Sequence, residues 1–326
     1  MIILICESMK KIAIITRDCA GVNAALRAVV RTANKHHIQT FGVIKGYDGL
    51  IDSKFITLNR SSVSGIVNLG GTILKTSRSK RFFTNDGQKK AIKNLHKNKI
   101  DGVIVIGGDG SLKGAHRLAK RTKIPVIGIP ATIDNDITGV DLTIGSDTAV
   151  NVVLDALDKI RDTATSLERI FLIEVMGRES GYIAMQVALA GGCEEVLLPE
   201  RKSDIKTMCE EIKQGNAKGK SSWIIIVAEG RAKAHDIARD VTFITGLETR
   251  VAVLGHIQRG GHPTGVDRIL ATKLGHYAVE ILRTGKTDVC VSIKNNKIVT
   301  IPLSRATQRK TIDVTETYKL IKLLTK

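Results

Sequence analysis

The chain has 326 residues, of which 43% are hydrophobic and 25% charged, and its formal net charge is +18. This composition excludes a disordered or collagen-like chain, and the length predicts about two domains. Five cysteines lie far apart without a C-x-x-C pair, which argues against a zinc site or a disulfide framework and favours the reducing cytoplasm.

The N-terminal segment does not predict a membrane protein. Residues Met1 to Ile5 are apolar but too few to span a bilayer, and no signal-cleavage pattern follows them. Met9 comes just before a strand-like run, so we expect the first eight residues to be an extension, with either Met1 or Met9 as the true start.

Apolar runs of strand length alternate with helical patterns along the chain. The strand-like runs cover 12–16, 103–106, 126–129, 170–175 and 223–227, and the helical patterns cover 23–33, 113–121 and 148–161. This alternation is typical of βαβ units, and continuous apolar runs suit strands that are covered on both faces. The sequence therefore predicts an α/β protein with largely parallel sheets, although no linker in its composition reveals a domain boundary.

The excess of positive charge comes largely from scattered lysines. Lys89, Lys90, Lys93, Lys97 and Lys99 are an example, and few aromatic residues lie near them to stack on bases. A net charge of +18 attracts polyanions, including nucleic acid and phosphorylated metabolites. We favour a solvated protein face over a nucleic-acid-binding patch.

The most informative stretch is the glycine-rich turn after the run Val103 to Ile106. It reads Gly107-Gly108-Asp109-Gly110-Ser111 and precedes a helical segment. Glycines let backbone N–H groups approach a ligand closely, and a helix N-terminus favours anions. Asp109 could hold Mg²⁺ against phosphates, although a plain strand-to-helix turn would look similar.

Polar residues also follow the strand-like runs that end at 129, 175 and 227, where parallel sheets bind their ligands, and a further cluster lies at 255–261. Asp134 and Asp136 could provide a base and order metal-bound water, or form a turn pair. Arg178 could stabilise a phosphoryl group in transfer, or form a surface salt bridge. His256 and Arg259 could bind a sugar phosphate, or pack at a helix entry.

Taken together, these clusters resemble the phosphofructokinase family over nearly the whole chain. The shared motifs, in family order and spacing, are Ile106 to Ser111, Thr132 to Asp136, Glu174 to Arg178, Ala190 to Glu194, Thr249-Arg250 and Leu254 to Gly261. The resemblance implies two similar doubly wound, Rossmann-like domains. It gives an ATP-binding domain of residues 9–145 plus 258–308 and a sugar-phosphate-binding domain of residues 146–257 plus 309–326.

The resemblance also implies a reaction and the residues that perform it. Asp134 would remove the proton from the 1-hydroxyl of fructose 6-phosphate, and Thr132 and Arg178 would stabilise the transferring phosphoryl group of ATP. Asp109 would hold Mg²⁺. The nucleotide would contact Arg78, Gly108, Asp109, Gly110, Ser111 and Gly114.

The same resemblance assigns the sugar and effector sites. The sugar phosphate would be bound by Thr132, Asp134, Arg169, Met176, Gly177, Arg178, Glu229, Arg250, His256 and Arg259. In family members Arg169 and Arg250 come from a neighbouring subunit, which implies a homotetramer. An effector, ADP or GDP or phosphoenolpyruvate, would bind Arg27, Arg31, Arg60, Arg161, Gly192, Glu194, Lys218 and Lys220.

Two positions bear on the phosphoryl donor. Pyrophosphate-using relatives carry Asp in place of Gly110 and Lys in place of Ala131, so the small residues here indicate ATP. Ala131 is itself a departure, since ATP-using members usually have Gly.

The first strand end departs further, because the family writes Thr-Ser-Gly-Gly-Asp there and this chain has Thr16-Arg17-Asp18, two residues shorter. Arg17 could replace the lost backbone donors or block the loop.

These observations predict a cytoplasmic, ATP-dependent 6-phosphofructokinase. The shortened loop keeps open a catalytically impaired, ligand-binding relative. Lipid and NAD kinases also use a Gly-Gly-Asp-Gly turn, but we do not expect them to carry the Thr132 and Gly255 motifs as well. A nucleic-acid-binding role would show steep salt dependence.

Overall fold

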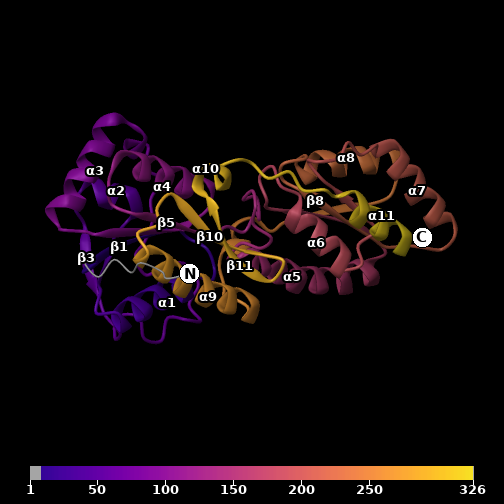
Figure 1. The fold of residues 1–326 in the computed structure, drawn as a ribbon. Coiled ribbons are helices and arrows are strands. Elements are labelled where there is room, and N and C mark those ends of the chain that lie inside the picture. Colours follow the sequence, from indigo (N-terminus) through magenta and orange to yellow (C-terminus); the bar gives the residue numbers. More distant parts are fainter. Residues whose placement is uncertain (1–8, 326) are drawn as a thin grey trace. The chain divides into compact units, whose positions relative to one another are not determined.

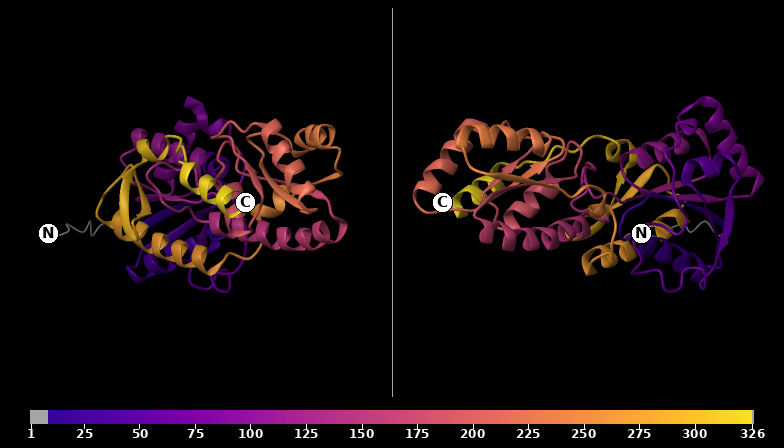
Figure 2. Two further views of the ribbon diagram at one scale, coloured as in Figure 1. Left: turned by 90° about the vertical axis from the view of Figure 1, so that its right-hand side faces the viewer. Right: turned by 180° about the vertical axis from the view of Figure 1, so that it is seen from behind.

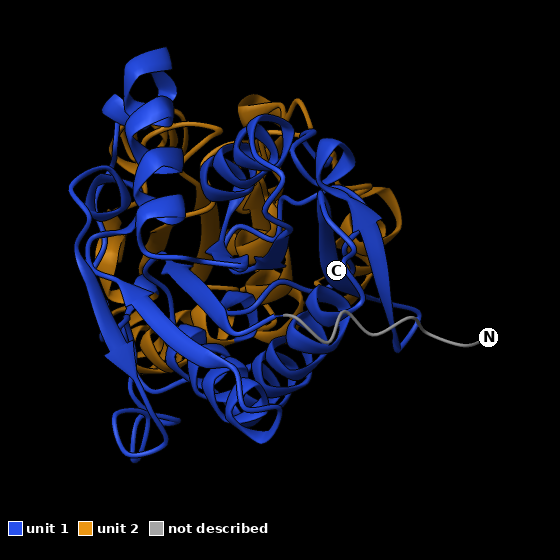
Figure 3. Ribbon diagram, turned by 60° about the vertical axis from the view of Figure 1, so that its left-hand side comes forward, with its two compact units in different colours: residues 1–147, 259–310 blue, residues 148–258, 311–326 orange. Residues whose placement is uncertain are grey.

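The computed structural model describes residues 9–325 and confirms the predicted α/β class (Figure 1). The chain divides into two compact units, coloured separately in Figure 3. Unit 1 comprises residues 1–147 and 259–310, and unit 2 comprises residues 148–258 and 311–326. The domain bounds expected from the family resemblance stay a prediction, as does the ligand assigned to each domain.

Unit 1 is built on a seven-stranded sheet. Its strands are β1 (Lys11–Thr16), β2 (Gln39–Val43), β3 (Phe55–Leu58), β4 (Gly102–Gly107), β5 (Val126–Pro130), β10 (Val289–Lys294) and β11 (Lys297–Pro302). They lie in the order β11-β10-β5-β4-β1-β2-β3, and only the outer pairs β10–β11 and β2–β3 are antiparallel. The five inner strands are parallel, as the continuous apolar runs predict.

Helices cover both faces of this sheet because the strand side chains alternate between two apolar cores (Figures 1 and 2). On one face α1 (Val22–Lys35) lies beside α9 (Gly265–Arg283). The other face carries α2, α3, α4 and α10, whose apolar residues pack with Val103 and Val105 of β4. Their bounds are α2 (Gly46–Ile51), η1 (Arg81–Phe83), α3 (Asn85–Lys97), α4 (Asp109–Arg121) and α10 (Leu303–Ala306).

Unit 2 repeats this plan with a smaller, fully parallel sheet in the order β7-β8-β6-β9. Its strands are β6 (Ile170–Val175), β7 (Glu195–Leu197), β8 (Trp223–Ala228) and β9 (Thr249–Val253). Helices α7 and α8 share one core with the sheet, and α6 lies against β7 and β8. The helices are α5 (Ser146–Leu167), α6 (Tyr182–Ala190), α7 (Ile205–Ala217), α8 (Ala234–Thr245), η2 (Gly255–Arg259) and α11 (Thr315–Leu324).

Each strand predicted from an apolar run is present, and the three predicted helices are all longer than their patterns, α4 and α5 by the most. Helix α4 begins at Asp109 rather than Lys113, so most of the glycine-rich turn is its first turn. Helix α5 extends from Ser146 to Leu167. Apart from Leu112 and Leu167, the added residues are polar or small, so apolar periodicity does not mark the full length of either helix.

The described cysteines are chemically inert. Cys19, Cys193, Cys209 and Cys290 are free and buried, whereas Cys6 and the proposed N-terminal extension lie outside the described residues. Burial raises the pKa of Cys19 and Cys290, and it raises the pKa of Cys193 to about 12. These thiols therefore stay protonated at neutral pH. Across residues 9–325, no helix is both long enough and apolar enough to cross a membrane.

Candidate functional site

The sheet of unit 1 has a topological switch point between β1 and β4. From β1 the chain moves to β2 on one side, and it later returns to place β4 on the other side. In parallel sheets a crevice opens at the carboxyl ends of two such strands, and ligands bind there. The ends of β1 and β4 carry Arg17 and the glycine-rich turn, so the sheet topology itself marks this place as a ligand site.

The glycine-rich turn is tightly built. A Cβ on Gly108 would lie 3.1 Å from Cβ of Thr132, whereas a Cβ on Gly110 would meet nothing within 4 Å. The carboxylate of Asp109 is partly exposed and accepts a hydrogen bond from Nζ of Lys113 at 2.9 Å. The turn thus presents open space at Gly110 and a carboxylate at the start of α4.

The motif after β5 forms a second rigid loop in unit 1. Asp134 is 5% exposed, and its backbone N–H donates to Oγ1 of Thr132 at 3.3 Å. Asn135 has a φ of 46° and is buried. Its side chain accepts from the N–H of Thr143 at 2.9 Å and donates to the carbonyl of Asp141 at 3.0 Å. These bonds fix the backbone on both sides of Asp134.

Gly114 has a packing role. A Cβ there would lie 2.5 Å from the ring of Tyr47, whose hydroxyl donates to the carbonyl of Ser111 at 2.7 Å. Gly114 therefore lets Tyr47 reach and hold the glycine-rich turn.

Unit 2 has its own switch point, between β6 and β9. After β6, Gly177 has a φ of 146° and Arg178 a φ of 53°, which is rare for a non-glycine residue. Glu229, after β8, accepts from the N–H of Gly177 at 3.2 Å and of Arg178 at 2.8 Å. Strained backbone held by a buried or bonded neighbour is a frequent feature of functional sites.

Two further residues complete the carboxyl end of this second sheet. Buried Gln258, in η2, accepts from the N–H of Met176 at 3.0 Å, so η2 is tied to the end of β6. His256 lies in the same short helix and is exposed. Met176, Gly177, Arg178, Glu229 and His256 therefore all lie at the carboxyl end of the unit 2 sheet.

Arg169 and Arg250 are not part of that group. Arg169 precedes β6 and Arg250 is the second residue of β9, so both lie at the amino end of the parallel strands. Both guanidinium groups pair with Glu248, and the Arg169–Glu248 distance is 2.7 Å. A strand of six residues spans roughly 20 Å, so these arginines cannot contact a ligand at the carboxyl end of their own sheet.

The residues expected at an effector site form two groups, one in each unit. In unit 1, Arg27 and Arg31 are one turn apart on α1, and Arg60 is exposed after β3. Burial lowers the pKa of Arg27, and the charge of Arg31 lowers it further. Nε of Arg31 is buried without a hydrogen-bond partner among the described residues. Two cations this close, with a buried donor, favour an anionic ligand.

The group in unit 2 surrounds the start of β7 and β8. Lys220 pairs with Glu194 at 3.0 Å, and Glu194 also accepts from the N–H of Ile224 at 2.7 Å. Arg161, on α5, donates to the carbonyl groups of Gly191 and Gly192. Lys218 is the exposed C-cap residue of α7.

Several residues that hold the loops of the candidate sites in place were not predicted from the sequence. They are Tyr47, Asn23, Gln258 and Thr143. Asn23, for example, donates to the carbonyls of Leu69 and Gly70, both at 3.1 Å, and accepts from the N–H of Ile73 at 3.0 Å. Their partners are up to 82 residues away in the chain, so no local pattern reveals them.

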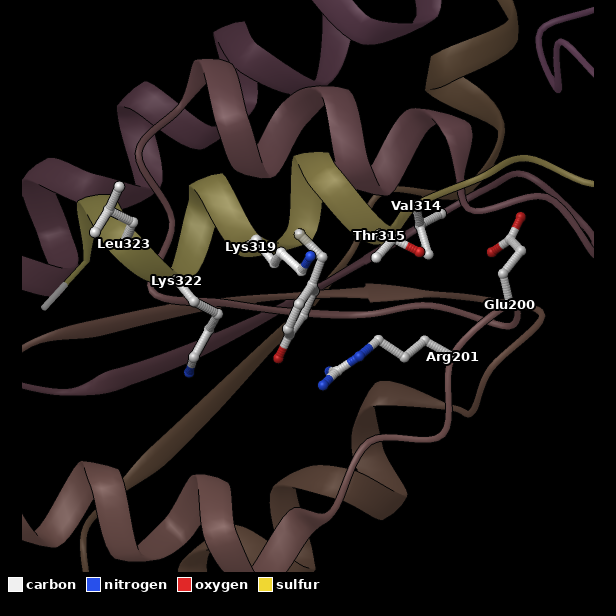
Figure 4. A pocket seen from close by; sticks show the side chains of 8 residues that line it. Glu200, Arg201, Val314, Thr315, Lys319, Lys322 and Leu323 are labelled. Atoms are coloured by element: carbon white, nitrogen blue, oxygen red, sulfur yellow. The ribbon is translucent and has the colours of Figure 1, made fainter.

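Unit 2 also has a pocket of about 590 Å³ beside α11 (Figure 4). No expected site residue lines it. Two of its cationic side chains have partners: the guanidinium of Arg201 lies 3.7 Å from the ring centroid of Tyr318, and Lys322 pairs with Glu195 and Glu211. Oε1 of Glu200 accepts from the N–H of Gly181 at 2.8 Å, whereas its Oε2 is buried without a hydrogen-bond partner among the described residues.

Comparisons with known proteins agree with the family resemblance found in the sequence. The family model described as phosphofructokinase matches residues 11–282. The ATP-dependent 6-phosphofructokinase of Thermotoga petrophila is 49% identical over 308 residues, which cover 94% of this chain and 97% of the relative. That of Bacillus subtilis is 51% identical over 293 residues, covering 89% and 92%.

Solved structures of phosphofructokinases have a fold similar to that of this chain. Phosphofructokinase from Saccharomyces cerevisiae superimposes with a TM-score of 0.83 at 34% identity, over 96% of this chain and 46% of the yeast chain. Pyrophosphate-dependent phosphofructokinase from Marinobacter aquaeolei gives 0.85 at 22% identity, over 96% and 91%, which shows the shared fold alone. With the motif order and the two switch points, these matches establish that the chain belongs to the phosphofructokinase family.

Proposed function

We propose that the chain transfers the γ-phosphoryl group of Mg·ATP to the 1-hydroxyl of fructose 6-phosphate, as a glycolytic enzyme of the cytoplasm. The observation that carries this proposal is at the carboxyl end of the unit 1 sheet, where the glycine-rich turn after β4 adjoins the Thr132–Asp134 loop after the neighbouring strand β5. A phosphate cradle beside a fixed carboxylate suits phosphoryl transfer to a hydroxyl. The relatives named ATP-dependent 6-phosphofructokinase support the same reaction.

In this proposal the turn holds the nucleotide. Backbone N–H groups at the start of α4 face the phosphates of ATP, with Arg78 as a further cation. Across residues 9–325 no three His, Cys, Asp or Glu side chains gather as a metal cluster. The partly exposed Asp109 nonetheless fits Mg²⁺, which commonly takes one carboxylate and fills its other positions with phosphate oxygens and water. Mg²⁺ bound there supplies charge neutralisation at the phosphates.

The acceptor is activated by Asp134. Its carboxylate takes the proton from the sugar 1-hydroxyl as the oxygen attacks the γ-phosphorus and the bond to the ADP oxygen breaks. Thr132 and Arg178 stabilise the charge on the transferring group. The rigid backbone around Asp134 supports this role, because a base that is already positioned need not be ordered during the reaction.

The sugar phosphate is bound by Met176, Gly177, Glu229, His256 and Arg259. Nε of Arg259 is buried and has no hydrogen-bond partner within the described part of the chain, which suits an arginine that awaits an anion. Arg169 and Arg250 would complete the phosphate site of a second chain, since they lie at the wrong end of their own sheet to serve it. We therefore propose a homotetramer in which neighbouring chains share sites.

The choice of ATP as donor is supported by the space at Gly110. A side chain at this position would project over the turn, where the α-phosphate of ATP would lie, and Gly110 leaves that space open. We also propose allosteric control by ADP, GDP or phosphoenolpyruvate. The closely spaced Arg27 and Arg31, and the Glu194–Lys220 pair in unit 2, support such a site.

The test is product formation by the purified protein. We expect fructose 1,6-bisphosphate from fructose 6-phosphate and Mg·ATP but not from pyrophosphate, at a rate that ADP or phosphoenolpyruvate changes. Binding of fructose 6-phosphate without turnover on either donor would instead identify a catalytically impaired relative. Turnover with pyrophosphate alone would contradict the assignment of the donor.

A further inference from the structure

The shortened turn after β1 is bonded to the loop that carries Arg78. Nη1 of Arg17 donates to Oγ1 of Thr76 at 3.2 Å and to the carbonyl oxygen of Ser77 at 2.8 Å. Just before it, the hydroxyls of Thr16 and Thr72 share a hydrogen bond of 2.7 Å. All of these residues belong to unit 1. The turn and the loop therefore meet at two points, although about 60 residues separate them in sequence.

The backbone and the aliphatic part of the Arg17 side chain also have defined contacts. The N–H of Arg17 donates to the carbonyl of Ile106 at 2.9 Å, which continues the pairing of β1 with β4. A Cβ on Gly107 would lie 2.9 Å from Cγ of Arg17, so only glycine leaves room for this stem. Arg17 thus lies directly against the start of the glycine-rich turn and does not extend into solvent.

The same loop is held from its other side by Asp48, on α2. One oxygen of this carboxylate accepts from Oγ of Ser77 at 2.6 Å, and the other accepts from Oγ of Ser79. The neighbours of Arg78 are therefore bonded on both sides. Arg78 itself is exposed. A cation held on a fixed backbone and free to reach outward is well placed to meet a ligand.

We propose that Arg17 is a positioning residue for the phosphoryl donor: it braces residues 76 and 77 so that Arg78 meets the nucleotide phosphates. Family members have glycine-loop backbone donors at this strand end, and this chain lacks those glycines. A braced Arg78 compensates for the missing backbone donors. Its backbone is already held in place, so nucleotide binding needs to order little more than its side chain. The inference rests on the proposed function for the identity of the ligand, but the brace itself does not depend on it.

The kinetic test compares Arg17→Ala, Arg17→Lys, Arg78→Ala and the double variant R17A/R78A. Loss of hydrogen bonds from a charged donor should raise KM for ATP about tenfold in Arg17→Ala. KM for fructose 6-phosphate and kcat should stay within about threefold, since the brace acts on nucleotide binding. Arg17→Lys should behave like Arg17→Ala, because both bonds come from Nη1 and the shorter lysine side chain ends one bond short of that position.

The double variant separates positioning from direct contact. If Arg17 acts through Arg78, R17A/R78A should be no worse than Arg78→Ala, within about twofold. Effects that multiply in the double variant, or normal kinetics in Arg17→Lys, would overturn the proposal. Arg121→Ala is the matched control, because this exposed arginine at the end of α4 also lies in unit 1 but donates to Asn85 instead. It should leave KM for ATP unchanged.

Hydrogen exchange tests the brace directly, without relying on enzyme turnover. Backbone amides of residues 75–79 should exchange hydrogen about tenfold faster in Arg17→Ala and about threefold faster in Thr76→Val, which removes one partner only. Amides of α9 should not change. Equal exchange in wild type and Arg17→Ala would contradict the brace. If the wild type lacks turnover with ATP, the proposed function fails while this exchange result still decides on the brace.

Discussion

At the scale of single residues, the loop after β5 shows how a reactive side chain is held. Asp134 is buried, and the residues that fix it are its neighbours: Thr132 accepts its N–H, and Asn135 bonds to Thr143 and Asp141. The left-handed backbone of Asn135 is tolerated because both ends of its amide side chain are bonded. These bonds of the neighbouring residues fix the backbone on both sides of Asp134.

We expect Asp134→Ser to lose turnover while keeping its substrates. Removal of a positioned general base should lower kcat by roughly 10²–10⁴-fold. Binding of fructose 6-phosphate, measured by equilibrium titration, should change much less, since the backbone bonds of the loop remain. Near-normal kcat in this variant would remove Asp134 from the mechanism. Asp136→Ser is the matched control, with a smaller expected loss.

At the scale of secondary-structure elements, the pair α1 and α9 sets the spacing of one layer of unit 1. A Cβ on Gly275 of α9 would lie 2.6 Å from the carbonyl oxygen of Ala25 and 2.8 Å from Cβ of Ala28, both on α1. The helices thus touch backbone to backbone at this position. Helix α1 begins at Val22, shortly after the shortened turn, so this contact also anchors the element into which the turn leads.

Gly275→Val should therefore destabilise the protein. Forcing a branched side chain into this contact should cost about 2 kcal/mol of unfolding free energy, the typical range for overpacking. The measurement is the urea midpoint, followed by circular dichroism. Lys273→Val, at an exposed position of the same helix, controls for β-branching and should shift the midpoint far less. An unchanged midpoint in Gly275→Val would show that the two helices can move apart freely.

At the scale of the whole molecule, one chain does not present all the expected sugar-phosphate contacts together. The residues at the carboxyl end of the unit 2 sheet and the pair Arg169 and Arg250 lie at opposite ends of the same strands. Two chains must combine if both groups bind one substrate. Both arginines pair with Glu248, which holds them close together.

Mixing two inactive variants tests this sharing of sites. Asp134→Ser lacks the base and Arg250→Ala lacks the phosphate contact contributed to a neighbour. After joint dissociation and reassembly, some sites should combine an intact Asp134 with an intact Arg250, so activity should return. Separately reassembled variants are the control and should stay inactive. Failure of the mixture, with mixed oligomers verified by mass spectrometry, would mean that each chain completes its own site.

The sequence by itself determined the α/β class, the parallel strands and the family. Continuous apolar runs such as Val103 to Ile106 are local signals, and they predict covered strands wherever they fall. The positions of the candidate residues after those strands follow from the same pattern. Their chemical roles came from the family resemblance and stay predictions.

The tertiary structure decided what local patterns cannot encode. It placed β1 next to β4 and so made a switch point, it put Arg169 and Arg250 at the amino end of their strands, and it gave Arg17 its partners. From sequence, Arg17 could have replaced the lost donors or blocked the loop; the structure instead turns it toward Thr76 and Ser77. The reason is physical: a hydrogen bond between residues about 60 positions apart depends on the path of the whole chain, whereas a strand depends on its neighbours.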